Sequence, residues 1–285
     1  MSGAVARLER PEATPAPETT RAEDELQRLA TLIRRNKFLP VPPSEINFIG
    51  DGDFIAVGVE FLQWFVRLGQ LMPSERVLDI GCGLGRMALP LTQYLDTGGY
   101  DGVDIAAGGI DWCTANIASH YENFRFHHLD LAHPLYNPAG TRSTTDIELP
   151  FEPASFDFIF LTSVVTHLTA AEVRAYAREI KRLLAPGGRC LMTAFMLNGP
   201  AREGLVAGGG LLPFDGADAA QEIYAFADSP TAAVAFEEDY LLSLFFDCGL
   251  RRLQPPVYGR WSGRSTPGDS FQDINVLQHA ASVDQ

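Results

Sequence analysis

The chain has 285 residues, 46% of them hydrophobic and 20% charged, so it can bury the core of one large domain or of one domain with a lid. Its formal net charge of −14 argues against a nucleic-acid partner, because a phosphate backbone requires a basic surface. The sequence has neither an apolar run of about 18 residues nor the apolar core of a signal peptide, so we expect a cytoplasmic protein with no membrane partner.

The N-terminal quarter is predicted to be helical after an unstructured start. Residues 1–21 are rich in Ala, Pro, Thr and Glu without apolar periodicity, which predicts a disordered tail. Apolar residues at helical spacing predict a helix over 22–36 and a second helix over Phe54–Leu68, ended by Gly69. We interpret residues 22–69 as a helical cap.

From residue 70 to residue 285 the pattern predicts one α/β domain. Strands are predicted near residues 76–81, 99–104, 124–128, 156–162 and 188–196, and helices near residues 84–96, 108–120 and 169–184. Strands separated by helices indicate βαβ units and a parallel sheet.

The segments after the fifth strand complete that domain. Residues 197–235 are rich in Gly and Ala, and we expect a lid-like insert with some helix over the strand ends. A helix over 236–247 and strands near 250–258 and 270–278 follow.

Residues 77–86, Val-Leu-Asp-Ile-Gly-Cys-Gly-Leu-Gly-Arg, predict a buried strand that enters a glycine turn and then a helix. Glycine lets the backbone approach a ligand closely, and the free N–H groups of a helix start face the same point. The unit is typical of nucleotide binding. Gly83, Gly85 and Ala88 also fit the dinucleotide fingerprint G-x-G-x-x-G/A. The spacing alone therefore does not exclude NAD as the ligand.

Ligands of open α/β sheets bind at the carboxyl ends of the strands. Asp104 ends the second strand, about 20 residues after Gly85, which is the usual place of a carboxylate that accepts ribose hydroxyls. Asp130 follows the third strand, and Ser163 follows the fourth. The four cysteines lack zinc-site spacing, so we expect no metal.

Together, Asp79-x-Gly81-x-Gly83-x-Gly85, these strand-end acids and the Pro186-Gly187-Gly188 turn resemble class I S-adenosylmethionine (SAM)-dependent methyltransferases over about residues 70–196. The resemblance implies a Rossmann-like, seven-stranded, mostly parallel sheet with helices on both faces and an antiparallel last strand. It also implies SAM as cofactor. The residues it assigns to SAM are Asp79, Gly81, Cys82, Gly83 and Gly85 near the methionine part, Asp104 at ribose, Ile105, Asp130 and Leu131 around adenine, and Ser163 near the sulfonium.

Candidate acceptor residues lie beyond the fourth strand and near the C-terminus. His167, four residues past Ser163, is the first candidate for a general base, and Asp273 is the second. Either can instead be a cap or a packing residue. Tyr136, Tyr258, Arg260 and Trp261 are candidate substrate contacts, although a hairpin with a buried Trp explains the last three equally well.

The sequence thus predicts a SAM-dependent methyltransferase that acts on an oxygen or nitrogen of a small molecule, of the kind found in secondary metabolism. Two alternatives stay open: a catalytically silent SAM-binding regulatory module, and an enzyme of the same fold such as an aminopropyl transferase. The N/D-P-P-[YF] signature of many nucleic-acid and glutamine methyltransferases is absent, and Thr162–Val165 stands in its place.

Overall fold

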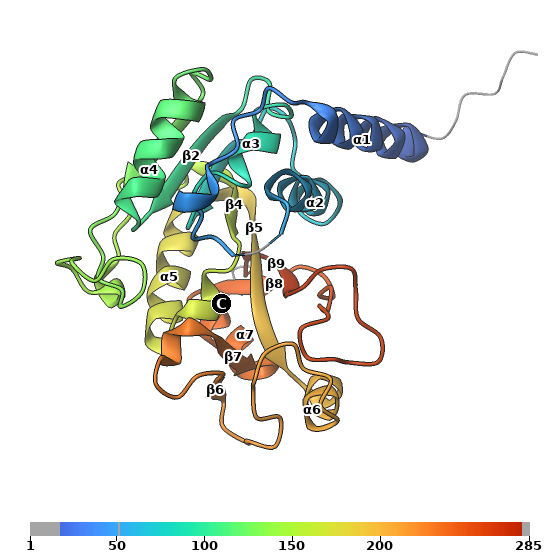
Figure 1. The fold of residues 1–285 in the computed structure, drawn as a ribbon, viewed down its shortest axis with the longest axis vertical. Helices are drawn as coiled ribbons and strands as arrows, with labels where there is room; N and C mark the ends of the chain where they lie inside the picture. The colour runs from blue at the N-terminus through green and yellow to red at the C-terminus, as the bar shows by residue number, and fades with distance from the viewer. Residues whose placement is uncertain (1–17, 51, 281–285) are drawn as a thin grey trace, which may run out of the picture.

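The computed structural model describes residues 18–50 and 52–280, and a twisted sheet of nine strands runs through the centre of this part of the chain (Figure 1). Five strands are parallel in the order β3-β2-β1-β4-β5. Their bounds are Arg76–Ile80 for β1, Gly99–Asp104 for β2, Phe124–His128 for β3, Phe156–Leu161 for β4 and Leu184–Leu197 for β5.

The long strand β5 carries the remaining strands along its other edge. The last strand β9, Asp273–His279, runs antiparallel to β5, as predicted, and β8, Leu250–Arg252, pairs with β9. Beyond β9, the end of β5 pairs in parallel with β7, Val234–Glu237, which in turn pairs with β6, Glu222–Tyr224. The expected seven strands are therefore nine within the described residues.

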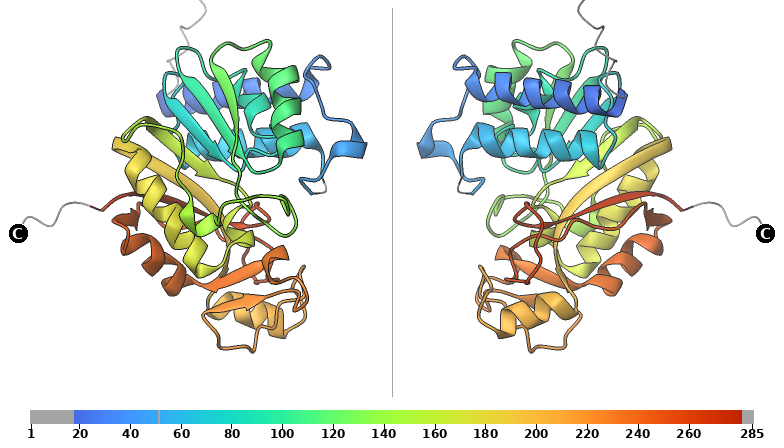
Figure 2. Two further views of the ribbon diagram at one scale, coloured as in Figure 1. Left: turned by 90° about the vertical axis from the view of Figure 1, so that its left-hand side faces the viewer. Right: turned by 90° about the vertical axis from the view of Figure 1, so that its right-hand side faces the viewer.

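Helices cover both faces of the sheet (Figure 2). On one face lie α1, Glu18–Arg35, α2, Phe54–Arg67, α3, Ala88–Leu91, and α4, Ala107–Cys113. On the other face lie α5, Ala170–Leu183, and α7, Glu238–Phe246, while α6, Gly199–Val206, belongs to the insert. No helix of the described residues is long and apolar enough to cross a membrane.

Alternating side chains of the central strands explain why both faces are covered. In β4, Ile159 packs in the core under α5 and α7, whereas Phe158 and Phe160 pack in the core under α1 to α4. Successive residues of a strand point to opposite faces, so the apolar run Phe158–Leu161 requires helices on both faces. The Phe65 ring of α2 stacks on Phe160 with 4.3 Å between centroids.

Several predicted bounds need correction. The helix expected over 84–96 is α only at Ala88–Leu91, because the residues before it form the glycine turn. The helix over 108–120 continues past α4 as a π-helix at Thr114–Ala118. The late strand near 250–258 is reduced to β8 and a single bridge at Val257. Helix α1 begins at Glu18, inside the predicted tail, and residues 1–17 lie outside the described residues.

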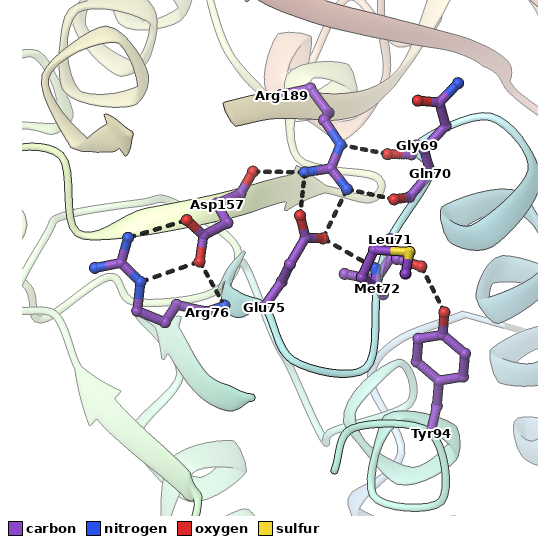
Figure 3. Close-up of polar contacts among 9 residues, drawn as sticks. All are labelled: Gly69, Gln70, Leu71, Met72, Glu75, Arg76, Tyr94, Asp157 and Arg189. Carbon is purple, nitrogen blue, oxygen red and sulfur yellow. Dashed lines mark hydrogen bonds and ion pairs between the residues drawn. The ribbon is translucent and has the colours of Figure 1, made fainter. Parts of the chain in front are cut away.

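A polar network closes the amino-terminal edge of the sheet, where β1, β4 and β5 begin (Figure 3). The Arg189 guanidinium donates to both carboxylate oxygens of Glu75 and to the backbone carbonyls of Gly69, Gln70 and Asp157. All five of its N–H groups are thus used. This network fastens the α2–β1 connection to β4 and β5 and leaves the opposite edge free for a ligand.

Candidate active site

The glycine turn after β1 has the backbone conformation that the sequence predicts. Gly81, Gly83 and Gly85 have φ of +83°, +55° and +74°, a region that other residues rarely adopt. The N–H groups of Gly81 and Cys82 donate to the carbonyl of Val103 at 2.8 and 3.1 Å, which holds the turn against β2. A Cβ at Gly81 would lie 2.4 Å from Val164, so the close packing also requires glycine here.

Asp104 links this turn to the end of β2. Its side chain accepts hydrogen bonds from the N–H groups of Gly83 and Ala106, each at 2.7 Å. Burial raises the pKa of the Asp104 carboxyl, and the two backbone N–H groups act in the opposite direction. The carboxylate also lines a cavity, where its remaining lone pairs can accept hydroxyls.

Asp79 lies beneath the turn and not on the cavity wall, which corrects the expected contact with the methionine part of the cofactor. It is only 1% exposed. The Tyr100 hydroxyl donates to its Oδ2 at 2.6 Å, whereas Oδ1 has no hydrogen-bond partner among the described residues. Burial raises the pKa of Asp79 to about 8.

The cavity has a volume of about 860 Å³ and opens at the carboxyl ends of the parallel strands. That volume suits a nucleoside cofactor together with a small acceptor. The sequence-predicted cofactor residues on its wall are Gly81, Cys82, Gly83, Asp104, Ile105, Leu131 and Ser163. Gly85 lies behind the wall, where a Cβ would meet Ile117 and Cys113.

Asp130 is not on the cavity wall. Its exposed carboxylate accepts hydrogen bonds from the backbone N–H of Thr141, at 3.0 Å, and from the Thr141 hydroxyl. The neighbours Leu129 and Leu131 line the cavity instead. The wall beside Asp130 is therefore apolar, and Asp130 itself holds the loop that carries Thr141.

Ser163, just after β4, has a φ of +59°, which is strained for a residue other than glycine. Its N–H donates to Thr193 Oγ1 at 2.8 Å, and its hydroxyl accepts from Gln272 Nε2 at 2.8 Å. Gln272 also lines the cavity. Groups from β5 and from the segment before β9 thus hold this turn in place, and Gln272 is not among the predicted site residues.

His167 lines the same cavity with a defined tautomer. Its Nδ1 lies 2.9 Å from the carbonyl oxygen of Thr231, which can only accept, so Nδ1 carries the proton. Nε2 then keeps its lone pair and lies 3.5 Å from the Tyr136 hydroxyl. Burial lowers the pKa of His167, so the ring is neutral at pH 7. The geometry is that of a proton acceptor.

Asp273, the second candidate base, is enclosed in the core and off the cavity wall. It is 0% exposed and accepts from the N–H groups of Met196 and Gly259 and from Trp261 Nε1, at 2.7, 2.8 and 2.8 Å. Arg264 Nη2 lies 3.6 Å away. Asp273 therefore organises the C-terminal loop and is not placed to meet an acceptor.

The four predicted substrate contacts divide into two pairs. Tyr136 and Arg260 line the cavity. Trp261 is 0% exposed in the core beneath the insert, and the Tyr258 hydroxyl donates to Glu238, so neither reaches the cavity. Trp261 is thus buried, as the alternative expects, whereas Arg260 on the cavity wall agrees with a substrate contact.

Sequence reasoning missed the wall formed by α2 and the segment before it. Phe48, Ile49, Val57, Glu60 and Phe61 line the cavity. The signal was present, because Val57, Glu60 and Phe61 have the spacing of one helix face, which adjoins the buried face. Across the described residues, no group of three or more His, Cys, Asp or Glu is placed to hold a metal.

Comparisons with known proteins show a similarity to methyltransferases. Residues 78–192 match the model of the methyltransferase domain. A polyketide synthase-nonribosomal peptide synthetase of Aspergillus clavatus is 28% identical over 191 residues, which are 64% of this chain and 4% of that protein. Phosphoethanolamine N-methyltransferase 2 of Caenorhabditis elegans is 30% identical over 151 residues, which are 53% of this chain and 30% of that protein.

Among solved structures, the CcbJ methyltransferase of Streptomyces caelestis superposes with a TM-score of 0.51 at 16% identity, over 89% of this chain and 96% of that one. This likeness concerns the fold. The chain spans less than a third of the length of each of the two sequence relatives.

Proposed function

Because residues 78–192 form a methyltransferase domain of the class I SAM-dependent family, we propose that the protein transfers a methyl group from SAM to an oxygen or nitrogen of a small molecule. SAM is the cofactor of this family. The observation that carries the proposal is the cavity at the strand ends, where a glycine turn and the buried Asp104 lie on one side and His167 lines another part of the wall.

The residues on the wall fit SAM. The Asp104 carboxylate is held by two backbone N–H groups and keeps lone pairs for two ribose hydroxyls. Ile105 and Leu131 offer apolar surfaces for the adenine, and the turn at Gly81 and Gly83 lets the backbone approach the methionine part. When bound, SAM supplies an activated methyl and a good leaving group, so the protein mainly aligns the acceptor.

His167 is the proton acceptor in this proposal. Its Nε2 lone pair takes the proton of the acceptor hydroxyl or amine, while the Thr231 carbonyl keeps the other ring nitrogen protonated. Thr231 belongs to the insert, so the insert orients the base.

Methyl transfer is tested with SAM that carries a labelled methyl and small-molecule fractions from the source organism. We expect label in a low-mass product and an equal amount of S-adenosylhomocysteine (SAH). Cofactor binding without transfer in any fraction would indicate a silent module. In a parallel assay with decarboxylated SAM that carries the same label, label retained in methylthioadenosine would indicate aminopropyl transfer.

The role of His167 is tested with the acceptor so identified. We expect His167→Ala to lower turnover about 100-fold while SAH affinity is unchanged, as the loss of a general base does. In the wild type the rate should rise with pH through a pKa below the ordinary value of about 6.5, and this limb should vanish in the variant. His120→Ala, an exposed histidine, is the control. Near-normal turnover of His167→Ala would mean that another group accepts the proton.

A further inference from the structure

Helix α2 places one carboxylate, Glu60, on the wall of the cavity. Val57, Glu60 and Phe61 line the cavity at helical spacing, while Leu62 and Phe65 on the adjoining face of the helix are buried against the sheet. The side chain of Glu60 is half-buried. A packed helix therefore fixes the position of this charge.

Glu60 has no cationic partner among the residues that the structure describes. Its one hydrogen bond comes from Trp64 Nε1 at 3.4 Å, well beyond the usual N–H···O distance of about 2.9–3.0 Å. A carboxylate that faces a cavity gains most from a positively charged hydrogen-bond donor.

Each of the other charged groups on the wall has at least one hydrogen bond of ordinary length to the backbone. Asp104 accepts two N–H groups. Arg86 donates to the carbonyl of Gly50 and lies over the Phe54 ring, and Arg260 donates to the carbonyl of Asp269. These contacts tie one part of the wall to another. Glu60 is the charged group that is left with a single weak contact.

Two further features of the cavity and of the protein favour a cation. Phe48, Phe61 and Phe271 line the same cavity, and the faces of aromatic rings attract positive charge. The net charge of −14 raises the local concentration of cations around the protein. Geometry, ring chemistry and the overall field therefore point the same way.

We propose that Glu60 binds a positively charged group of the acceptor, so that the natural acceptor is a cationic, amine-bearing small molecule. The inference rests on the proposed function, because it assumes that the cavity holds SAM and an acceptor together. The proposal concerns the positive charge of the acceptor and not the atom that is methylated. Glu60 is thereby a specificity-determining residue.

The test uses three probes of similar size and different charge on the SAH-loaded protein: phenethylamine, 2-phenylethanol and 3-phenylpropionate. Dissociation constants are measured by ligand-observed NMR for the wild type, for Glu60→Gln and for Glu45→Gln, whose exposed carboxylate lies outside the cavity wall. We expect phenethylamine to bind at least about tenfold more tightly than the other two probes, the ratio that a charged hydrogen bond provides.

In Glu60→Gln this preference should disappear while the affinity for SAH stays unchanged, and Glu45→Gln should behave like the wild type. Equal binding of the three probes to the wild type, or tighter binding of the anion, would overturn the proposal without any variant. A tenfold loss of SAH affinity in Glu60→Gln would overturn it too, because Glu60 would then belong to the cofactor. Failure of the wild type to bind SAH would instead refute the proposed function.

Discussion

Two buried carboxylates under the glycine turn have different hydrogen-bond partners. Asp104 accepts two backbone N–H groups and faces the cavity, whereas Asp79 accepts one hydroxyl and keeps an oxygen without a partner among the described residues. Burial raises the pKa of both, and that of Asp79 reaches about 8. Asp79 therefore holds its proton at pH 7, whereas the two backbone N–H groups favour the charged form of Asp104.

The raised pKa of Asp79 makes stability depend on pH. The folded protein holds the Asp79 proton up to about pH 8, while the unfolded chain releases it near its ordinary pKa of about 3.9. The contribution of this group to stability is therefore present in acid and is lost as the pH rises towards 8. Asp79→Asn cannot lose a proton, so its unfolding free energy should gain on that of the wild type between pH 6 and pH 9. Urea titrations at both values measure the difference, and a difference that does not change with pH would contradict the pKa.

The sequence predicts which polar residues lie at the strand ends, but it does not predict their hydrogen-bond partners. Asp104 and Ser163 were predictable because strand ends meet at one edge of the sheet. Asp130 also follows a strand end, but its carboxylate accepts a hydrogen bond from the backbone N–H of Thr141. Thr141 lies in a loop of no regular structure, which the sequence pattern does not place. Asp273 looked like a free acid because its partners Met196, Gly259 and Trp261 come together only in the folded chain.

The glycine turn is an element whose conformation depends on the segments that touch it. Gly83 donates to Asp104 and packs against Ile49, which precedes α2. The turn therefore joins the cofactor wall to the segment that closes the cavity.

Gly83→Val tests this element. A Cβ there would lie 2.7 Å from Ile49 at a φ of +55°. We expect SAH affinity to fall at least about tenfold, a cost of about 1.4 kcal/mol. Gly187→Val is the matched control, because Gly187 has a φ of +79° but a Cβ there meets nothing within 4 Å. The control should lose stability and keep its affinity. Equal affinities for the two variants would mean that the turn is only a connection.

Predicted elements held where they were long and periodic. The central strands lie close to their predicted ranges, and α2 and α5 do so because helical spacing repeats several times within each of the two helices. The short strands β6 and β7 were missed in a Gly- and Ala-rich insert, since they form by pairing beyond β9 on the extended end of β5. Pairing with another strand determines the structure of these residues. A strand of three or four residues is too short to show a periodic pattern.

At the scale of the whole molecule, the two edges of the sheet have separate roles. The amino-terminal edge is closed by the Arg189 network, and the carboxyl-terminal edge holds the cavity. Stability and ligand binding should therefore respond to different substitutions.

Arg189→Met should lower the unfolding free energy by about 3 kcal/mol or more, because it leaves the mostly buried Glu75 without its partner. SAH affinity should stay within about twofold, since the network lies at the far edge. Arg76→Gln breaks the exposed pair with Asp157 and should cost less than about 1 kcal/mol. Chemical denaturation and calorimetric titration measure the two quantities. A large loss of SAH affinity in Arg189→Met would show that the edges are coupled.

The central claim is that SAM binds in the cavity at the strand ends. A crystal structure of the protein with SAH tests this claim directly. We predict the ribose hydroxyls within hydrogen-bond distance of Asp104, the adenine between Ile105 and Leu131, and the sulfur facing the turn at Ser163. SAH bound elsewhere, or a ribose with no contact to Asp104, would contradict the account.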